Sequence, residues 1–373
     1  MELLTPTDWT DYELIDTGNR EKLERFGRYI LIRPEPQAVW EKAMPAEEWE
    51  KLHHARFARG KPESPQSAVG SQQLAVGSKS SPSHKNPASG IRHPVSKEDR
   101  GEWIRKPAMP DQWMIGYNYK EMQLKFRLGL TAFGHIGVFP EQAENWKFAY
   151  DKIQLAAGSR QLAGNSSRNS GHIEQNPASD IRYPASGIRI LNLFAYTGGA
   201  SLAAKAAGAD VVHVDSVKQV INWAREDMEV SNLDGIRWVI EDAIKFVRRE
   251  VKRGNRYDGI ILDPPAYGRG PDGEKWILED SINEMISLCS ELLSPQSSVG
   301  SPQLAVGNPQ SSVHSPKSPF LILSLYSMGF SSLIGENLVR SHFKNIGELQ
   351  SGELCFTDRA GRNLPLGTVT RFF

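Results

Sequence analysis

A carboxylate directly before two prolines, Asp263-Pro264-Pro265, with Tyr267 two residues further on, is the part of this sequence best suited to chemistry. Two successive prolines fix φ and remove two backbone donors, so the turn should be rigid and its carbonyl groups free. A rigid carboxylate and carbonyl beside an aromatic ring would hold a planar base and orient it toward a methyl donor, a reaction that depends on positioning. The same residues would also suit a rigid loop that merely ends a strand.

A glycine pair lies earlier in the chain, in Phe194-Ala-Tyr196-Thr197-Gly198-Gly199, between an apolar run and an alanine-rich stretch. Glycines let a backbone approach a ligand without a Cβ clash, and the free N–H groups at the start of a following helix suit a carboxylate or phosphate. The adjacent glycines do not form the Gly-x-Gly-x-x-Gly fingerprint, which disfavours a nicotinamide-dependent dehydrogenase. A tight turn without a ligand is the alternative.

Acidic residues follow the next two apolar runs, at Asp215 and at Glu241-Asp242. An acid at the first position would accept hydrogen bonds from both hydroxyls of a ribose. An acceptor at the second would meet the exocyclic amine of an adenine. Either carboxylate alone would equally suit a solvated loop or a helix cap, but the order of glycine loop and two acids predicts one nucleoside-like ligand lying across a sheet.

Short apolar runs alternate with amphipathic stretches from residue 188 onward, which predicts an α/β domain with a parallel sheet covered on both faces. The expected strands are 188–194, 211–214, 237–240, 259–262 and 320–325, and the expected helices are 199–207, 217–232, 243–252, 277–293 and 331–340. Residues 346–356 and 367–373 read as a closing antiparallel hairpin.

Residues 1–150 are expected to form a smaller α+β region ahead of a Rossmann-like domain over 151–373. Its predicted elements are strands at 29–33 and 123–128, a helix at 46–59 and a helix through 146–150. Three stretches rich in Ser, Pro, Gly, Gln and Asn, about 64–95, 158–186 and 294–318, repeat parts of one another. Their irregular spacing excludes a solenoid, so we interpret them as surface-loop insertions, which cost little closure entropy.

Composition limits the class of protein. The chain has 373 residues, 39% of them hydrophobic and 24% charged, and a formal net charge of zero, so any contact with nucleic acid must be local. Only two cysteines, Cys289 and Cys355, are present, which argues against a disulfide framework or a zinc site. We expect no signal peptide, no membrane span and no bound metal, and hence a cytoplasmic protein.

Taken together, the motifs resemble those of class I S-adenosylmethionine-dependent methyltransferases. They are Leu191–Gly199, Val212-His-Val-Asp215, Glu241-Asp242 and Asp263-Pro-Pro265, and they are most similar to those of the family related to bacterial large-subunit ribosomal RNA methyltransferases. The resemblance is strongest over 188–330 and extends to 134–142.

The resemblance implies S-adenosylmethionine as the cofactor, with the glycine loop around its methionine part, Asp215 on the ribose and Asp242 on the adenine. It implies the cofactor-binding set Phe194, Tyr196, Thr197, Gly198, Gly199, Asp215, Ser216, Asp242, Ala243 and Asp263, and the catalytic set Asp263, Pro264, Pro265 and Tyr267.

The acceptor is less defined. Family members that methylate carbon 5 of cytosine resemble one another in a Cys after the fifth strand, because a thiolate must first add to the ring. Here that segment, 323–329, has no Cys, which disfavours this chemistry. Families that methylate exocyclic amines resemble Asp/Asn-Pro-Pro-Tyr, but Ala266 intervenes here, so the atom stays open. Candidate acceptor contacts are Ser324, Tyr326 and Ser327, and candidate phosphate contacts are Arg269, Arg359, Arg362 and Arg371.

We expect methyl transfer to a base in ribosomal RNA without a Cys-dependent carbon-5 mechanism. A methyltransferase for a small molecule or protein is the alternative, favoured by the neutral charge. A scaffold that only binds nucleic acid is a further one. His135, among glycines, suits a general base or a structural turn equally. The sequence leaves the oligomeric state open.

Overall fold

The structure is a computed structural model that describes residues 2–59, 101–166, 187–293, 319–326, 330–344 and 346–373. The predicted insertions at 64–95 and 294–318 lie outside these residues, and so do residues 167–186 of the predicted insertion at 158–186. The predicted start of that insertion at residue 158 is wrong, because helix α2 (Ala143–Ser166) continues through residues 158–166. An alanine-containing stretch without proline can extend a helix that packing has already started.

Eight described strands form the large sheet, in the order β1-β16-β17-β15-β12-β9-β10-β11. Its central strands are parallel: β9 (Arg189–Leu193), β10 (Asp210–Asp215), β11 (Arg237–Ile240), β12 (Gly259–Leu262) and β15 (Phe320–Leu325). β16 (Leu349–Thr357) and β17 (Asn363–Phe372) form an antiparallel hairpin, and β17 pairs with β15. The predicted Rossmann-like α/β fold with a closing hairpin is confirmed.

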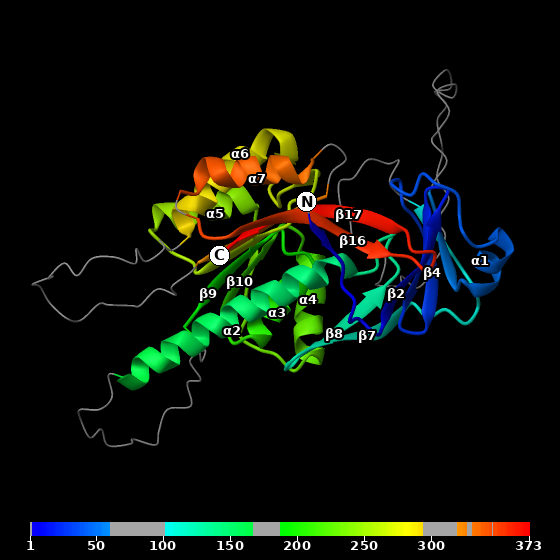
Figure 1. Ribbon diagram of the computed structural model, residues 1–373, viewed down its shortest axis with the longest axis horizontal. Coiled ribbons are helices and arrows are strands. Elements are labelled where there is room, and N and C mark those ends of the chain that lie inside the picture. The colour runs from blue at the N-terminus through cyan, green and yellow to red at the C-terminus, as the bar shows by residue number, and fades with distance from the viewer. Residues whose placement is uncertain (1, 60–100, 167–186, 294–318, 327–329, 345) are drawn as a thin grey trace, which may run out of the picture.

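Helices cover both faces of this sheet, as Figure 1 shows. One face carries α2, α3 (Gly199–Ala206) and α4 (Lys218–Val230), and the other carries α5 (Ala243–Lys252), α6 (Leu278–Leu292) and α7 (Ser332–His342). Two separate apolar clusters lie on the two faces, which is why β12 and β15 are buried at every position. In α6, Ile282, Met285, Ile286 and Cys289 give the three-and-four spacing of a buried helix stripe.

The N-terminal part contains a five-stranded sheet of β2 (Tyr12–Gly18), β3 (Glu21–Phe26), β4 (Tyr29–Pro34), β5 (Ala55–Arg59) and β6 (Gly101–Arg105). β7 (Gln112–Tyr119) and β8 (Met122–Gly129) form a two-stranded sheet. The predicted helix over 46–59 is wrong in its second half: α1 (Ala46–Leu52) ends at an extended His53, and β5 follows. Ala55 and Phe57 alternate inward, so β5 is buried as a strand between β4 and β6.

The N-terminal part is built into the large sheet at two places. β1 (Glu2–Leu4) pairs with β16 at the sheet edge, and Gly137 O accepts from Thr197 Oγ1 (2.6 Å) in the loop after β9. A separate domain over 1–150 remains a prediction, and these contacts show where such a domain would be joined to the rest.

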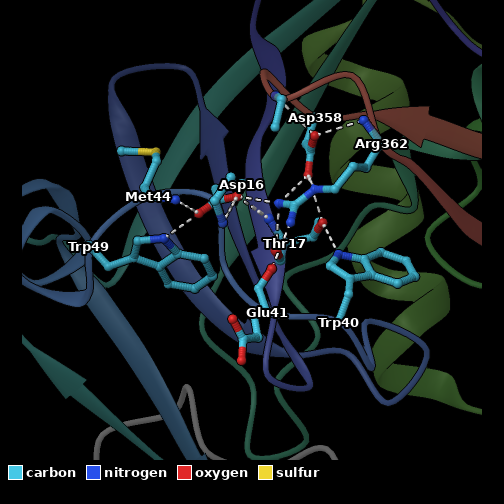
Figure 2. A network of polar contacts seen from close by, with 10 residues as sticks. Asp16, Thr17, Trp40, Glu41, Met44, Trp49, Asp358 and Arg362 are labelled. Atoms are coloured by element: carbon cyan, nitrogen blue, oxygen red, sulfur yellow. Dashed lines mark hydrogen bonds and ion pairs between the residues drawn. The ribbon is translucent and has the colours of Figure 1, made fainter.

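A polar network holds the turn between β16 and β17 against the N-terminal sheet (Figure 2). Arg362 donates from Nε to Asp358 Oδ2 (2.9 Å) and from Nη2 to Asp16 Oδ1 (2.5 Å). The same carboxylates accept from Thr17 Oγ1 (2.7 Å, to Asp358) and from Trp49 Nε1 (2.8 Å, to Asp16). Arg362 is therefore occupied by carboxylates of the protein, in contrast to its predicted place on phosphate.

The neighbouring arginines also have internal partners. Arg359 donates to Glu13 (2.7 Å), and Arg371 is buried and donates from Nε to Gln350 Oε1 (2.5 Å). Burial lowers the pKa of Arg371 to about 10. Of the four arginines considered as possible phosphate contacts, three thus bind groups of the protein itself, and Arg269 is an exposed residue whose Nε donates to Tyr267 Oη (3.2 Å).

Candidate active site

The carboxyl ends of the central strands meet at one edge of the sheet and bring the predicted motifs together. Leu193 is paired with Val214 on one side and with Leu262 on the other. The glycine loop after β9 therefore lies between Asp215, at the end of β10, and Asp263, just after β12. Asp215 is paired with Ile240, so Asp242 follows on the next strand along the same edge. Their roles toward a ligand remain predictions.

Asp215 is fixed by backbone donors on both carboxylate oxygens. Tyr196 N donates to Oδ2 and Val217 N donates to Oδ1, each at 2.9 Å. Burial nevertheless raises the pKa of Asp215 above its ordinary value, against the lowering effect of these hydrogen bonds. A partly buried, pre-positioned acceptor of this kind suits the paired hydroxyls of a ribose. Ser216 lies directly after Asp215, in the turn that leads to α4.

The glycine loop has an unusual backbone. Phe194, Tyr196 and Gly198 have φ values of 55°, 49° and 87°, so two non-glycine residues adopt the left-handed region. That conformation costs a non-glycine residue of order 1–3 kcal/mol and clusters at ligand sites. Thr197 Oγ1 ties the loop to the segment before α2 by donating to Gly137 O at 2.6 Å.

A Cβ added to either glycine would meet protein, and contact of their backbone with a ligand stays a prediction. A Cβ on Gly199 would lie 2.3 Å from the Trp146 ring, and one on Gly198 would lie 3.2 Å from Ala224 Cβ. Gly199 is thus required by close packing and Gly198 also by its positive φ. The start of α3 is capped by no side chain among the described residues, so its first N–H groups stay available for a carboxylate.

A buried hydrogen-bonded chain supports the loop from below and was missed from the sequence. Asn192 Nδ2 donates to Ser201 Oγ (2.9 Å), and Ser201 Oγ lies 3.0 Å from His213 Nδ1. Burial, helped by Arg225, lowers the pKa of His213 to about 3, so the ring is neutral. The only sequence signal was a His inside an otherwise apolar strand, Val211-Val-His-Val214.

Asp242 is the N-cap of α5, accepting from Lys245 N at 2.9 Å. The preceding Glu241 forms two hydrogen bonds with the Arg249 guanidinium, each 2.6 Å long. Asp242 therefore caps a helix, as one interpretation of the sequence suggested. Its contact with an adenine stays a prediction. Ala243 begins α5 and is buried.

The Asp263-Pro264-Pro265 turn is tied to the glycine loop by a tryptophan. Trp276 Nε1 donates to Pro265 O at 2.6 Å, and the Trp276 ring lies 4.7 Å from that of Phe194. The predicted free carbonyl at Pro265 is thus occupied. Trp276 belongs to a hairpin of β13 (Tyr267–Arg269) and β14 (Lys275–Ile277) that the sequence pattern did not indicate, since each strand has three residues.

Asp263 and Tyr267 differ in their surroundings. Burial, helped by the charge of Glu141, raises the pKa of Asp263 to about 7. Tyr267 is 41% exposed and is the first residue of β13. Asp263 therefore has the features of a group that exchanges protons near neutrality, whereas the Tyr267 ring is presented outward from the hairpin.

The segment 134–142 reaches the same edge. The Phe139 ring lies 5.2 Å from that of Tyr196, and Gln142 Oε1 accepts from Asn145 Nδ2 (2.8 Å) and from Ser324 Oγ (3.3 Å). Ser324 is thereby buried within the protein, in contrast to its predicted acceptor contact. Tyr326 is 51% exposed, and Ser327 lies outside the described residues.

These features fit S-adenosylmethionine. The uncapped start of α3 would take its carboxylate, Asp215 its ribose hydroxyls and Asp242 its adenine amine. Within the described ranges, no group of three His, Cys, Asp or Glu side chains is arranged to hold a metal. Cys289 and Cys355 are free and buried, inside α6 and β16. No helix of the described part of the chain is both long and apolar enough to cross a membrane.

Known proteins are similar to this chain in sequence and in fold. A family model described as S-adenosylmethionine-dependent methyltransferase matches residues 177–308. The crystal structure of a SAM-dependent methyltransferase from Agrobacterium tumefaciens is 30% identical, covers 100% of this chain and 93% of its own, and superposes with a TM-score of 0.71.

Curated relatives match over shorter stretches. Ribosomal RNA large subunit methyltransferase I of Aeromonas hydrophila is 38% identical over 84 residues, which is 22% of this chain and 21% of that protein. The protein of the same name from Escherichia coli is 37% identical over 82 residues, 21% of either chain. The chain thus spans about a fifth of the length of these two relatives.

Proposed function

The chain belongs to the S-adenosylmethionine-dependent methyltransferases, and from that premise we propose that it transfers a methyl group from this cofactor to a base of ribosomal RNA. The substrate part is supported by curated relatives named for ribosomal RNA, over about a fifth of their length. Such a substrate would place the protein in the cytoplasm.

The observation that carries the proposal is Asp263, a partly buried carboxylate on a rigid turn at the sheet edge, with its pKa raised to about 7. When bound, the cofactor supplies a methyl group activated on a sulfonium sulfur. The start of α3, Asp215 and Asp242 would hold the cofactor, and Phe194, Tyr196–Gly199, Ser216 and Ala243 would line it. Asp263, with Pro264 and Pro265, would orient the acceptor and accept a proton from it. Tyr267 would stack on an exposed base.

The chemistry we propose is methylation without a covalent protein intermediate. A carbon-5 mechanism needs a reactive thiolate, and the two cysteines of the sequence lie buried in α6 and β16. Burial also raises the pKa of the Cys289 thiol well above its ordinary value. A nitrogen acceptor is consistent with these surroundings.

The test is methyl transfer from labelled cofactor into ribosomal RNA taken from a strain that lacks the gene, followed by mass spectrometry of the nucleosides. We expect one methylated nucleoside that is absent from the untreated RNA, and no label in RNA from the parent strain. Absence of label in both RNAs, with cofactor binding intact by calorimetry, would exclude ribosomal RNA as the acceptor.

A small molecule or a protein is the second candidate acceptor, and the charge distribution favours it. The net charge is zero, and Arg359, Arg362 and Arg371 are bound to groups of the protein itself. Binding dominated by phosphate weakens steeply with salt. RNA affinity that barely changes between low and physiological salt would therefore favour this second candidate.

A further inference from the structure

A second carboxylate, Glu141, reaches the edge where Asp263 lies. Glu141 is in the 3-10 helix η3 (Pro140–Gln142), between β8 and α2, and its side chain is buried. The segment that carries it is fastened on both sides: Gly137 O accepts from Thr197 Oγ1 (2.6 Å), and Gly134 O accepts from Arg33 Nη1 (3.4 Å). Its place is thus set by the cofactor loop and by the N-terminal sheet together.

The strand register locates Glu141 relative to Asp263. Leu262 is paired with Leu323, so Asp263, which follows β12, lies level with Ser324 near the end of β15. Ser324 Oγ donates to Gln142 Oε1 (3.3 Å) and accepts from Asn145 Nδ2 (2.9 Å). Glu141, the residue before Gln142, is therefore held beside the turn that carries Asp263, and its charge helps to raise the pKa of Asp263.

The cations near Glu141 are held by other carboxylates. Arg33 donates to Glu24 from Nε (2.8 Å) and Nη2 (3.0 Å), and Lys22 Nζ lies 3.2 Å from Glu35 and 3.7 Å from Glu24. Lys22 and Arg33 still lower the pKa of Glu141, but burial outweighs them and raises it to about 7.

Around Glu141, the charged and titratable groups come from each neighbouring element: Lys22 and Glu24 on β3, Arg33 on β4, Tyr12 on β2, Tyr326 after β15 and Asp263 after β12. Tyr12 donates to Glu24 (2.9 Å) and is neutral, because burial and the charge of Glu24 raise its pKa. Burial and Glu35 raise the pKa of Tyr326 as well. The groups that change charge near pH 7 in this cluster are thus Glu141 and Asp263.

Resting on the proposed function, we propose that Glu141 is a positioning residue for methyl transfer: it acts on Asp263 through its charge, and the two carboxyl groups together retain one proton and recognise an acceptor base that carries an N–H. One protonated and one ionised carboxyl group present a donor and an acceptor together. Adjacent N–H and acceptor atoms on the edge of a nucleobase complement that arrangement.

The proton balance of the reaction uses the ionised member of the pair. The new N–C bond forms as the C–S bond of the cofactor breaks, and the sulfur keeps the electron pair of that bond. The N–H proton of the acceptor passes to the ionised carboxylate and then to water. Two neighbouring like charges disfavour double ionisation, which keeps the pair in its singly protonated form around neutral pH.

The test compares Glu141→Gln, Glu141→Asp and the control Glu35→Gln, a buried carboxylate of the same cluster whose partner is Lys22. Two readouts are followed from pH 5 to 9: the rate of methyl transfer under single-turnover conditions, and the carboxyl infrared bands of the protein without cofactor. In the wild type, an acid limb with a pKa of about 7 leaves roughly a tenth of the plateau rate at pH 6.

We expect Glu141→Gln to move both the acid limb and the infrared titration of Asp263 to lower pH, raising the rate at pH 6 by up to about tenfold relative to its own plateau. Glu141→Asp keeps the charge and should retain the wild-type profile, and Glu35→Gln should leave both readouts unchanged. Identical profiles in Glu141→Gln and the wild type, or an equal shift in Glu35→Gln, would overturn the proposal. If no RNA is methylated by the wild type, the proposed function fails, and the infrared titration still decides the role of Glu141.

Discussion

Two regions of the molecule gather buried carboxylates, and they partner them in opposite ways. At the β16–β17 turn, Asp16 and Asp358 share the guanidinium of Arg362 and accept further hydrogen bonds from the N-terminal part (Figure 2). Burial tends to raise the pKa of Asp358, but the hydrogen bonds from Arg362 and Thr17 keep it below its ordinary value. At the sheet edge, burial instead raises the pKa values of Asp263 and Glu141 to about 7.

The contrast separates a structural junction from the edge at which we propose that the reaction takes place. A fully partnered carboxylate gains stability from being ionised and has little capacity left for a ligand. A buried carboxylate whose nearby cations are engaged elsewhere costs stability and stays able to bind or transfer a proton. Partnering, and not the number of polar contacts, therefore indicates which of the two regions carries chemistry.

Replacing Asp263 with Asn should have the largest effect, confined to activity. Loss of a proton acceptor at the reacting centre lowers the rate of transfer by roughly 10²–10⁴-fold. Above pH 7 the folded protein should be no less stable, because an ionised, poorly partnered carboxylate is removed from a buried position. Single-turnover transfer and urea unfolding at pH 8 measure both. Wild-type rates in this variant would show that Asp263 takes no part in methyl transfer.

Arg362→Ala should show the reverse pattern, a large loss of stability. The variant leaves Asp16 and Asp358 buried without their shared cation, which costs about 3–5 kcal/mol in the free energy of unfolding. Arg359→Ala is the matched control, since its pair with Glu13 is exposed and should be worth at most about 1 kcal/mol. Urea unfolding gives both values. Equal losses in the two variants would show that the network in Figure 2 is no stronger than a surface ion pair.

The difference between the regions also explains what the sequence could predict. Short apolar runs alternating with amphipathic stretches predict a covered parallel sheet, and such a sheet brings the ends of its strands together whatever the loops contain. Asp215, Asp242 and Asp263 could therefore be placed on one edge from their positions alone. Arg362 and Asp16 are 346 residues apart and follow no periodic pattern, so no local signal links them.

Errors at the level of single elements have equally local causes. Residues 46–59 have helical spacing at first, but the strand Ala55–Arg59 gains its register from pairing with β6, across a long segment of chain. Trp276 lies in a hairpin too short to show alternation and could not be linked to Pro265 in advance. The sequence singled out the glycine pair as a place where a ligand could approach the backbone. The structure adds a packing reason for Gly199, because the Trp146 ring fills the space beside it.

Asp227 sharpens the comparison, because it is a poorly partnered carboxylate on helix α4 and not in a loop at the strand ends. Its Oδ1 accepts from Arg127 N (2.8 Å), its Oδ2 has no partner among the described residues, and burial raises its pKa to about 8. The folded protein therefore binds a proton that the unfolded chain releases near pH 4, so stability falls as the pH rises from about 4 to about 8.

Asp227→Asn should remove that slope and stabilise the protein at pH 9 by about 1–3 kcal/mol. Methyl transfer should change little, since Asp227 lies on α4 (Lys218–Val230) and reaches the loop after β9 only through its charge, which helps to raise the pKa of Tyr196. Unfolding by urea at pH 5, 7 and 9, with transfer measured at pH 8, checks both. Loss of activity would show that weak partnering alone, without a place at the strand ends, is enough to mark a functional carboxylate.

Trp276→Phe should give the smallest effect and tests whether the Asp263-Pro264-Pro265 turn depends on the Trp276 side chain. The variant keeps a ring beside Phe194 but removes the donor to Pro265 O, a loss of about 1 kcal/mol in unfolding free energy. Trp113→Phe is the matched control, because Trp113 Nε1 donates to a backbone carbonyl, Phe26 O (3.2 Å), in the N-terminal part. If the clamp positions the cofactor edge, calorimetry will show weaker cofactor binding in Trp276→Phe alone, while both variants lose similar stability. Equal affinities would reduce Trp276 to a packing residue and leave the Asp263 turn rigid through its prolines.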